Sequence, residues 1–467
     1  MECFNGLFAK RPKLVQLPVT PGKVPIFVML QLDWLSDDGQ ALRYKEDLKR
    51  QLTAAKTAGV KGVMADVWWG LCEPKPEDYH FGGALELCNL LKSLGLELQA
   101  VMSFHQCGGN VGDSVSFPLP DWCLNKAKSG GFLYKSKWGV TSEDCLSLSA
   151  DRQQIFPTGA GGTRTALQCY QDFMAAFLKA MGNHVGSTIC ELQVGMGPCG
   201  ELRYPSYLMS NGWNWPGVGI AMAYDKGMLQ MLKDDAGMTE PPKSLPEDQN
   251  AMPDDIPIFK APGMEFRSGT AKAFLEWYSS VLIRHGRDVL SEAKKAIDRV
   301  GSYPANKFCL SVKVSGLHWH VTHPSRATEA CAGYNCCTSE AADAYMAIAK
   351  MLAESSKEAK RPILFNFTCM EMTNDSNGGV PKALSAPEDL IAQVRKACIF
   401  HQVPLAGENA LEFDIATGDW AFKQMEKQIR SFSPGSDAMH GLTLLRLSDN
   451  FVRPESLQQL GLFVSKI

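Results

Sequence analysis

The sequence predicts an α/β fold of the (β/α)8 TIM barrel type, with long strand-to-helix loops that form a small lobe over the C-terminal face. Three observations lead to this prediction. Short apolar runs, rich in β-branched residues, alternate with longer stretches of helical periodicity along the 467 residues. The runs are apolar almost throughout, as expected of parallel strands that are covered on both faces. Neither glycine pattern of an open nucleotide-binding sheet, GxGxxG or GxxxxGKS/T, follows any of them.

Eight of these runs are expected to be the barrel strands. In chain order they are residues 24–32, 62–69, 97–104, 188–195, 308–315, 363–368, 403–406 and 441–447. Between them lie helical patterns, such as Leu48, Leu52 and Ala55 on one helix face. Helix-to-strand connections are short, whereas long segments follow the third and fourth strands. Since all strand-to-helix loops of a barrel emerge at one end, these long loops predict a deep, walled site there.

Length and charge limit the remaining possibilities. A chain of this length could hold about three ordinary domains, but a barrel with long loops explains it as one catalytic domain, residues 24–467, after an N-terminal extension, residues 1–23. Lys and Arg total 47 against 50 for Asp and Glu, a net charge of −3, so no basic excess favours nucleic acid. No apolar run approaches the roughly 20 residues of a membrane helix. We therefore expect neither nucleic acid nor a membrane as a partner.

The 15 cysteines are odd in number and include no CxxC pair, which indicates a reducing compartment rather than a disulfide framework. The tightest group, Cys331, Cys336 and Cys337, is expected to consist of exposed loop thiols rather than a redox or metal site. The N-terminus shows no secretory signal, and residues 1–21 lack serine, unlike an organelle transit peptide. These features indicate either a cytoplasmic location or a transit peptide that is missing from this sequence.

Polar side chains follow most of the predicted strands, and together they predict a site. They are Asp66, His105, Glu201, Lys313, His318, Thr368, Glu408, Asn409 and Arg446. Two carboxylates from opposite sides of a barrel mouth suit glycoside hydrolysis, in which one protonates the leaving oxygen and the other activates water or attacks carbon. Five tryptophans near this mouth offer flat faces for sugar rings: Trp68, Trp69, Trp213, Trp215 and Trp319.

Other patterns allow further interpretations. The glycines in residues 108–113 could form a mobile lid that carries Asp113 to a substrate, or an ordinary turn. The histidines of residues 318–323 include an HxH pair that could bind metal, but no second pair exists, so we predict no metal and no cofactor. A serine nucleophile is not expected because GxSxG is absent.

At these residues the sequence resembles the plant-type β-amylases. The resemblance extends over residues 24–464 and includes GVMADVWWG, VMSFHQCGGNVGD, GPCGELRYPSY and AGENAL. It implies a (β/α)8 barrel that removes β-maltose from the non-reducing ends of α-1,4-glucans with inversion, so that starch and maltooligosaccharides are the expected partners. Inverting enzymes hold the two carboxyl groups about 6.5–9.5 Å apart to leave room for a water.

By this resemblance, Glu201 would be the general acid and Glu408 the general base. Asp113 would lie on a flexible lid and Thr368 on an inner loop that moves on binding. The remaining positions that the resemblance assigns to sugar contacts are Asp66, His105, Lys313, His318, Asn409, Ala410 and Arg446. A monomer is favoured. Gln193 and residues 317–320 are similar to the plastid branch, which favours the chloroplast although no transit peptide is visible.

The chain also departs from the pattern of this family. Glu412, Phe413 and Asp414 stand where Pro-Arg-Tyr usually follows, and they place new negative charge near the base or a sugar subsite. This departure motivates an alternative function, a non-catalytic glucan-binding or regulatory scaffold. A third hypothesis is that oxidation of Cys107, Cys199 and Cys369 controls the activity. These cysteines are neighbours of residues that match the β-amylase pattern.

Overall fold

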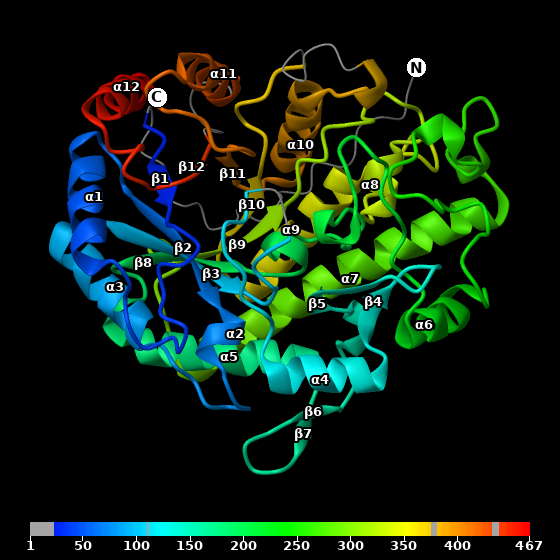
Figure 1. The fold of residues 1–467 in the computed structure, drawn as a ribbon, viewed down its shortest axis with the longest axis horizontal. Helices are drawn as coiled ribbons and strands as arrows, with labels where there is room; N and C mark the ends of the chain where they lie inside the picture. Colours follow the sequence, from blue (N-terminus) through cyan, green and yellow to red (C-terminus); the bar gives the residue numbers. More distant parts are fainter. Residues whose placement is uncertain (1–22, 110–111, 375–380, 432–438) are drawn as a thin grey trace, which may run out of the picture.

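Eight parallel strands close into a barrel, as predicted (Figure 1). The computed structural model describes residues 23–109, 112–374, 381–431 and 439–467, so nearly all of the expected N-terminal extension lies outside the described residues. Around the barrel the order is β1-β12-β11-β10-β9-β8-β3-β2. The strands are β1 (Ile26–Met29), β2 (Gly62–Trp68), β3 (Glu97–Ser103), β8 (Ile189–Val194), β9 (Cys309–Val314), β10 (Ile363–Phe367), β11 (Leu405–Glu408) and β12 (Leu442–Leu444).

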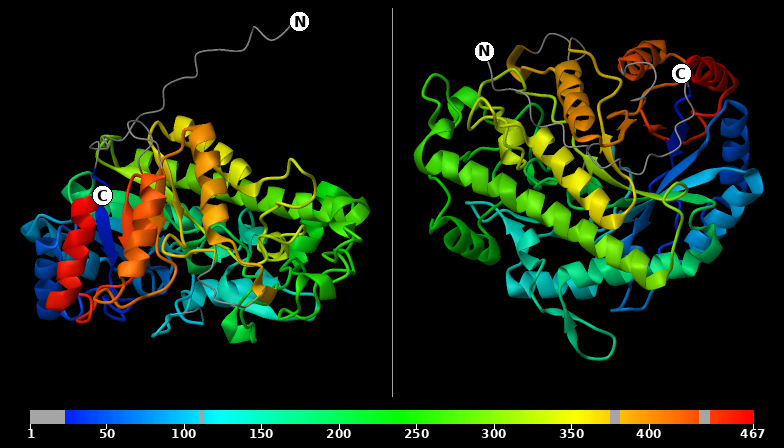
Figure 2. Two further views of the ribbon diagram at one scale, coloured as in Figure 1. Left: turned by 90° about the horizontal axis from the view of Figure 1, so that it is seen from above. Right: turned by 180° about the vertical axis from the view of Figure 1, so that it is seen from behind.

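A helix follows each barrel strand and packs against the outside of the barrel (Figure 2). These helices are α1 (Lys45–Thr57), α3 (Gly82–Leu94), α5 (Ala166–Met181), α7 (Gly269–Val300), α9 (Ala344–Ala359), α10 (Pro387–His401), α11 (Asp419–Arg430) and α12 (Pro454–Lys466). Local sequence explains several of their ends. Helix α5 begins with a capping box, in which Thr165 Oγ1 accepts from Gln168 N and Gln168 Oε1 accepts from Thr165 N. Helix α3 ends at Gly95, whose φ of 64° suits glycine.

The long segments after β3 and β8 contain secondary structure that the sequence patterns did not predict. It consists of α4 (Asp121–Gly130), the hairpin β4 (Leu133–Lys135) and β5 (Thr141–Leu146), the hairpin β6 (Phe156–Pro157) and β7 (Thr163–Arg164), and α6 (Lys226–Ala236). Two shorter helices, α2 (Trp69–Cys72) and α8 (Ala327–Cys331), follow β2 and β9. Asp225 joins the two segments, because its carboxylate accepts from Ser147 and Ser149 and also caps α6.

Inside the barrel, polar side chains form two hydrogen-bonded tiers. In the lower tier, Gln99 Nε2 donates to Glu191 Oε2 at 2.8 Å, and Thr443 Oγ1 donates to Gln99 Oε1 at 3.1 Å. In the upper tier, Asn366 Nδ2 donates to Gln193 Oε1 at 3.0 Å and to Glu408 Oε1 at 2.7 Å. Since buried polar groups are costly unless they are paired, these bonds hold the strands in register beneath the barrel mouth.

The cysteines contradict one expectation. Cys331 and Cys337 are buried and Cys336 is only partly exposed, so the prediction of exposed loop thiols was wrong. Cys331 lies on α8, and Cys337 belongs to the main hydrophobic core. All of the cysteines in the described part of the chain are free thiols. Among the described helices, none combines the length and apolar character needed to span a bilayer.

Candidate active site

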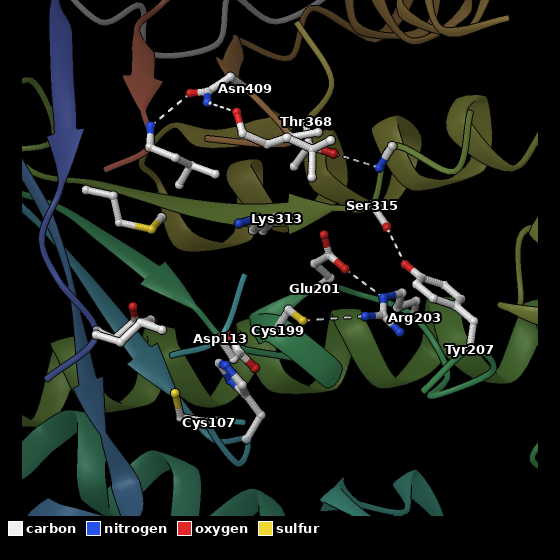
Figure 3. A pocket seen from close by; sticks show the side chains of 18 of the residues that line it. Cys107, Asp113, Cys199, Glu201, Arg203, Tyr207, Lys313, Ser315, Thr368 and Asn409 are labelled. Atoms are coloured by element: carbon white, nitrogen blue, oxygen red, sulfur yellow. Dashed lines mark hydrogen bonds and ion pairs between the residues drawn. The ribbon is translucent and has the colours of Figure 1, made fainter. Parts of the chain in front are cut away.

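A cavity of about 520 Å³ opens at the carboxyl ends of the barrel strands and collects nearly all of the predicted site residues (Figure 3). The predicted residues that line it are Asp66, His105, Asp113, Glu201, Lys313, His318, Thr368, Asn409, Ala410 and Arg446. Glu408 is the exception. Its side chain is fully buried and does not line the cavity, although the next two residues do. The structure therefore places Glu201 in the wall and Glu408 beneath the floor.

Glu201 is positioned by a tight turn after β8. Cys199 adopts a φ of 54° in this turn, and Leu202 N donates to Lys313 O, which anchors the turn to β9. Glu201 Oε2 accepts from Arg203 Nε at 2.6 Å, as Figure 3 shows. The Arg203 guanidinium in turn lies 4.3 Å from the centre of the Tyr207 ring. One carboxylate oxygen is thus fixed by Arg203, which leaves Oε1 for a ligand in the cavity.

Glu408 ends β11 and is held from two sides. Asn366 Nδ2 donates to its Oε1, and Lys313 Nζ lies 2.7 Å from its Oε2. Burial opposes a charge on Lys313, but the carboxylates of Glu408 and Glu201 outweigh it and raise the lysine pKa above its ordinary value. Lys313 is therefore a fixed positive charge between the two glutamates, where it reduces their mutual repulsion.

Asp66 and His105 occupy the side of the cavity built by β2 and β3. Ser103 Oγ donates to Asp66 Oδ1 at 2.8 Å, and burial raises the pKa of Asp66 against the effect of this bond. Burial, assisted by Lys313 and Arg203, lowers the pKa of His105 to about 3. The imidazole is therefore neutral near pH 7 and can both donate and accept a hydrogen bond to sugar hydroxyls.

The opposite side of the cavity is formed by residues that follow β9, β10 and β11. Thr368 Oγ1 accepts from Gly316 N at 2.8 Å, and His318 Nδ1 lies 2.8 Å from Ser385 Oγ. Burial lowers the pKa of His318 to about 4, so this imidazole is also neutral. Asn409 bridges two loops, since its Nδ2 donates to Leu411 O and its Oδ1 accepts from Leu445 N. These bonds fix the cavity rim before any ligand binds.

Four of the five predicted tryptophans line the cavity, namely Trp68, Trp213, Trp215 and Trp319. Trp69 does not, and its expected place near a substrate was wrong. It begins α2 and is fully buried, with edge contacts to Phe104 and Trp122. On the lid segment, Gly108 N donates to Asp113 Oδ2 at 3.0 Å. Residues 110–111 of that segment lie outside the described residues.

The three histidines of the HxH segment serve separate purposes. His318 lines the cavity, whereas His320 and His323 are buried behind it. His320 Nδ1 contacts Thr328 Oγ1, and His323 Nδ1 contacts Ser325 Oγ, both at 2.8 Å. Each ring is thus oriented by a partner of its own, which disfavours a shared metal ion at this segment.

The family-atypical acids lie away from Glu408. Glu412 is exposed, and its Oε1 is 3.4 Å from Arg446 Nε, while Asp414 pairs with Arg453 at 2.6 Å. The new negative charge therefore reaches a predicted sugar contact, Arg446, rather than the predicted base.

The thiols proposed for redox control are poorly suited to it. Cys107 and Cys369 are buried, and Cys199 is partly exposed in the cavity. Burial raises the pKa of all three thiols well above the ordinary value. Because the thiolate is the reactive form, the structure argues against oxidative control at these positions.

Four functional side chains were not singled out from the sequence. Arg203 and Tyr207 support Glu201, while Asn366 and Gln193 support Glu408. Arg203 and Tyr207 stand in the quoted GELRYPSY motif, so their proximity to Glu201 was the available signal. Asn366 and Gln193 are polar residues inside otherwise apolar, buried strands, and that position was the available structural indication.

A barrel whose mouth holds an acidic side chain in the wall, a second beneath the floor and tryptophans along the sides has the architecture of a barrel glycosidase. Residues 27–467 match the model of glycosyl hydrolase family 14. The chain belongs to this family.

Several beta-amylases match almost the whole chain. Beta-amylase 1, chloroplastic, of Arabidopsis thaliana is 41% identical over 457 residues, which are 96% of this chain and 76% of that protein. The beta-amylase of Glycine max is 36% identical over 453 residues, 95% of this chain and 87% of that protein. Among solved structures, the catalytic domain of the beta-amylase from Paenibacillus polymyxa superposes with a TM-score of 0.73 at 27% identity, covering 96% of this chain and 99% of that one.

Proposed function

We propose that the chain is a β-amylase, an exo-acting hydrolase that inverts the anomeric centre and releases β-maltose from the non-reducing ends of α-1,4-glucans. One observation carries the proposal. Glu201 and Glu408 both interact with Lys313 at the carboxyl end of a family 14 barrel, so that one acidic group lies in the cavity wall and the other beneath its floor. Starch and maltooligosaccharides are the substrates that this activity implies.

In this proposal, Glu201 protonates the leaving glycosidic oxygen. Its Oε2 is bonded to Arg203, so the proton is delivered from Oε1. Arg203 then stabilises the carboxylate that remains after the proton has left. Tyr207 holds the guanidinium in place, because its ring packs against Arg203 and its hydroxyl contacts Ser315 Oγ at 2.9 Å.

Glu408 activates the water that attacks the anomeric carbon from the opposite side. Because its side chain is fully buried, the floor must open slightly for this water to reach it. Thr368 is the residue that we expect to move when substrate binds, since a substrate hydroxyl could replace Gly316 N as its hydrogen-bond donor. Asp66, His105, Asp113, Lys313, His318, Asn409, Ala410 and Arg446 would bind the sugar hydroxyls.

The test is the anomer of the first disaccharide that the purified chain releases from soluble starch, followed by NMR. We expect β-maltose. Glu201→Gln and Glu408→Gln should each lower the rate by at least about 100-fold, because each removes a proton-transfer group. Glu97→Gln is the matched control, since this glutamate pairs with Lys61 at the far end of the barrel. Release of α-maltose, or equal rates in all variants, would contradict the proposal.

The same assay separates the enzyme from the alternative, a non-catalytic glucan-binding or regulatory scaffold. The scaffold was suggested by Glu412, Phe413 and Asp414, but the contacts of both acids lead to arginines and not to Glu408. Glucan binding without turnover in the wild-type chain would support the scaffold. Ordinary turnover would exclude it.

We further propose that residues 24–467 act as one catalytic domain, that the chain works as a monomer, and that its site of action is the chloroplast. The location is supported by chloroplastic relatives from Arabidopsis thaliana and Oryza sativa subsp. japonica, which are 41% and 39% identical to this chain. A fusion of the natural full-length protein to a fluorescent marker would test the location, and a cytoplasmic signal would overturn it.

A further inference from the structure

Three side chains of different chemistry meet at the amino-terminal end of the barrel, on the far side of the interior from the active-site cavity. They are Glu191, Cys309 and His440. One ligand atom of each, a carboxylate oxygen, the thiol sulfur and an imidazole nitrogen, lies within 4.8 Å of the other two. None of these residues lines the active-site cavity, and the proposed reaction uses none of them.

The barrel itself brings these residues together. Glu191 on β8 and Cys309 on β9 are register partners, so their side chains lie next to each other on the inner face. His440 precedes β12, and its backbone N–H donates to Leu405 O on β11 at 2.8 Å. In the order of the closed barrel, β12 lies four strands from β8 in either direction. The imidazole therefore approaches the Glu191–Cys309 pair from the opposite wall.

The donor atoms are left with unused bonding capacity. Glu191 is 1% exposed, and its Oε2 is bonded to Gln99. Its other oxygen has the Ser311 hydroxyl as a neighbouring donor, whereas His440 Nδ1 has no hydrogen-bond partner among the described residues. Cys309 Sγ makes one long contact, 3.6 Å to Cys190 O. Buried groups without partners are rare in folded proteins, so this arrangement calls for a ligand.

We propose that Glu191, Cys309 and His440 form a binding site for a divalent transition-metal ion, with Zn²⁺ the best match. A thiolate, an imidazole and a carboxylate together are a donor set typical of zinc, whereas Ca²⁺ and Mg²⁺ select oxygen ligands. Donors about 2.0–2.3 Å from a zinc ion in a tetrahedral site lie about 3.3–3.8 Å from one another. The donor atoms here lie within 4.8 Å of one another, so the widest separations would shorten by up to about 1 Å when an ion binds. A water molecule would complete the usual four ligands.

Such an ion would act as a structural clamp. It would link β8 and β9 to the segment before β12 across the barrel axis, below the tier that holds Glu408. His440 is partly exposed, so it is the ligand nearest to solvent, and it lies at the opposite end of the barrel from the active site. Binding requires the thiolate, so the thiol proton is released to solvent when the ion binds.

The experiment measures metal content and a spectrum, not only activity. The purified full-length chain is incubated with ZnSO₄, dialysed against metal-free buffer and analysed for zinc. We expect about one zinc per wild-type chain and less than about a tenth of that in Cys309→Ala and His440→Asn, since each removes a ligand. Cys190→Ala is the matched control, because this neighbouring thiol lies on β8 outside the group and should leave binding intact.

Cobalt provides the second readout. Co²⁺ in place of zinc should give a thiolate charge-transfer absorption in the wild type and in Cys190→Ala, and none in Cys309→Ala. Starch hydrolysis and near-ultraviolet circular dichroism show whether each variant is folded, and His440→Asn, at the partly exposed position, tests the site if a buried variant misfolds. Absence of stoichiometric zinc from the wild type, or equal zinc in all variants, would overturn the proposal.

Discussion

At the scale of single residues, the cavity is organised by charge pairs that differ in exposure. The Lys313–Glu408 and Arg203–Glu201 pairs have little solvent contact, whereas Glu412, opposite Arg446, is 58% exposed. Buried pairs are costly to break because one charge is left unpaired, while exposed pairs contribute little. The exposed pair is therefore the one that substitution can remove without damage to the catalytic groups.

We expect Glu412→Ala to lower KM for maltooligosaccharides about two- to fivefold with little change in kcat, because an exposed ion pair is worth about 0.2–1 kcal/mol. The substitution frees Arg446 to bind sugar hydroxyls. Steady-state kinetics on oligosaccharides of defined length provides the measurement. Asp414→Ala serves as the control, since its partner Arg453 does not line the cavity. Equal effects of both variants, or a higher KM for Glu412→Ala, would show that Arg446 is not held back by Glu412.

Most of the predicted site residues line the cavity because they lie near the carboxyl ends of barrel strands or in the loops after them, and all of these ends meet at one end of the barrel. Trp69 could not, because α2 begins there and turns it away from the mouth that Trp68 faces. The burial of Glu408 was equally unpredictable, since it depends on Lys313 and Asn366 from two other strands. Contacts of that kind exist only after the barrel has closed.

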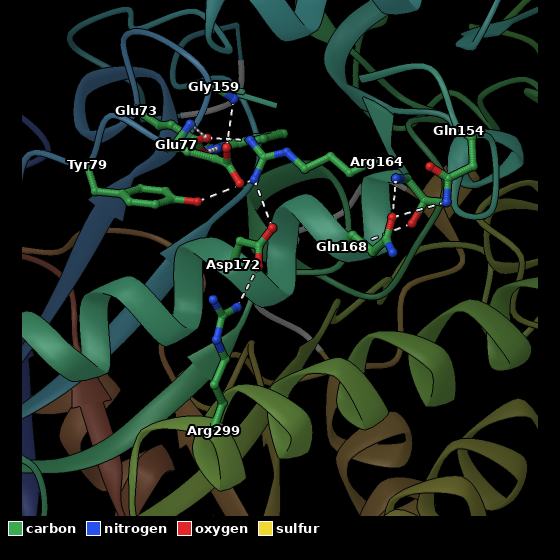
Figure 4. Close-up of polar contacts among 11 residues, drawn as sticks. Glu73, Glu77, Tyr79, Gln154, Gly159, Arg164, Gln168, Asp172 and Arg299 are labelled. Atoms are coloured by element: carbon green, nitrogen blue, oxygen red, sulfur yellow. Dashed lines mark hydrogen bonds and ion pairs between the residues drawn. The ribbon is translucent and has the colours of Figure 1, made fainter. Parts of the chain in front are cut away.

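At the scale of elements, one buried arginine joins the loop after α2 to the helices outside the barrel (Figure 4). Arg164, at the end of β7, pairs with Glu73 at 2.6 Å and with Asp172 on α5 at 3.1 Å. Arg299 on α7 reaches the other oxygen of Asp172 at 2.9 Å. The Glu73 side chain is fully buried, and its charge is balanced chiefly by Arg164.

We expect Arg164→Met to lower the free energy of unfolding by about 3–5 kcal/mol, because it leaves Glu73 buried without its counter-charge. Arg299→Met is the matched control. Its side chain is 62% exposed, so its loss should cost less than about 1 kcal/mol. Urea unfolding followed by tryptophan fluorescence measures both. If the two variants lose the same stability, the network does not depend on burial of Glu73.

The barrel strands and outer helices could be predicted because their apolar periodicity extends over many residues. The inserted elements could not. Strands β6 and β7 have two residues each, and helix α6 depends on Asp225 and its serine partners from the preceding segment. Such short elements are set by tertiary contacts rather than by their own pattern, so the sequence predicted the long loops but not the helices and hairpins within them.

At the scale of the whole molecule, buried neutral histidines make stability depend on pH. Burial lowers the pKa of His105 to about 3 and those of His318 and His320 to about 4. In the unfolded chain a histidine binds its proton near pH 6.5. Between these values the unfolded state binds more protons than the folded state, so stability falls as the pH decreases.

We expect His105, His318 and His320 to make no contribution to the pH dependence of the free energy of unfolding above about pH 6.5, and to lower it below that pH by up to about 1.4 kcal/mol per pH unit for each of the three. His320→Asn should reduce this slope by up to about 1.4 kcal/mol per pH unit, the contribution of one proton. His320 suits the test because it is fully buried and does not line the cavity. Urea unfolding at a series of pH values between about 4.5 and 7.5 gives both slopes. Parallel curves for the two proteins would show that His320 does not titrate in this range.

The pairing of β1 with β12 also determines when the protein can first fold. Ile26 lies opposite Leu442, so the barrel is closed by the pairing of its first strand in the sequence with its last. On the ribosome, β1 and β11 must remain as open strand edges until the final strand has been made, and open edges are where chains aggregate. A chain that is released before residue 442 contains both Glu201 and Glu408, but its sheet cannot close into a barrel. The barrel therefore cannot close until residues 442–444 have been made, and the facing edges of β1 and β11 stay unpaired until then.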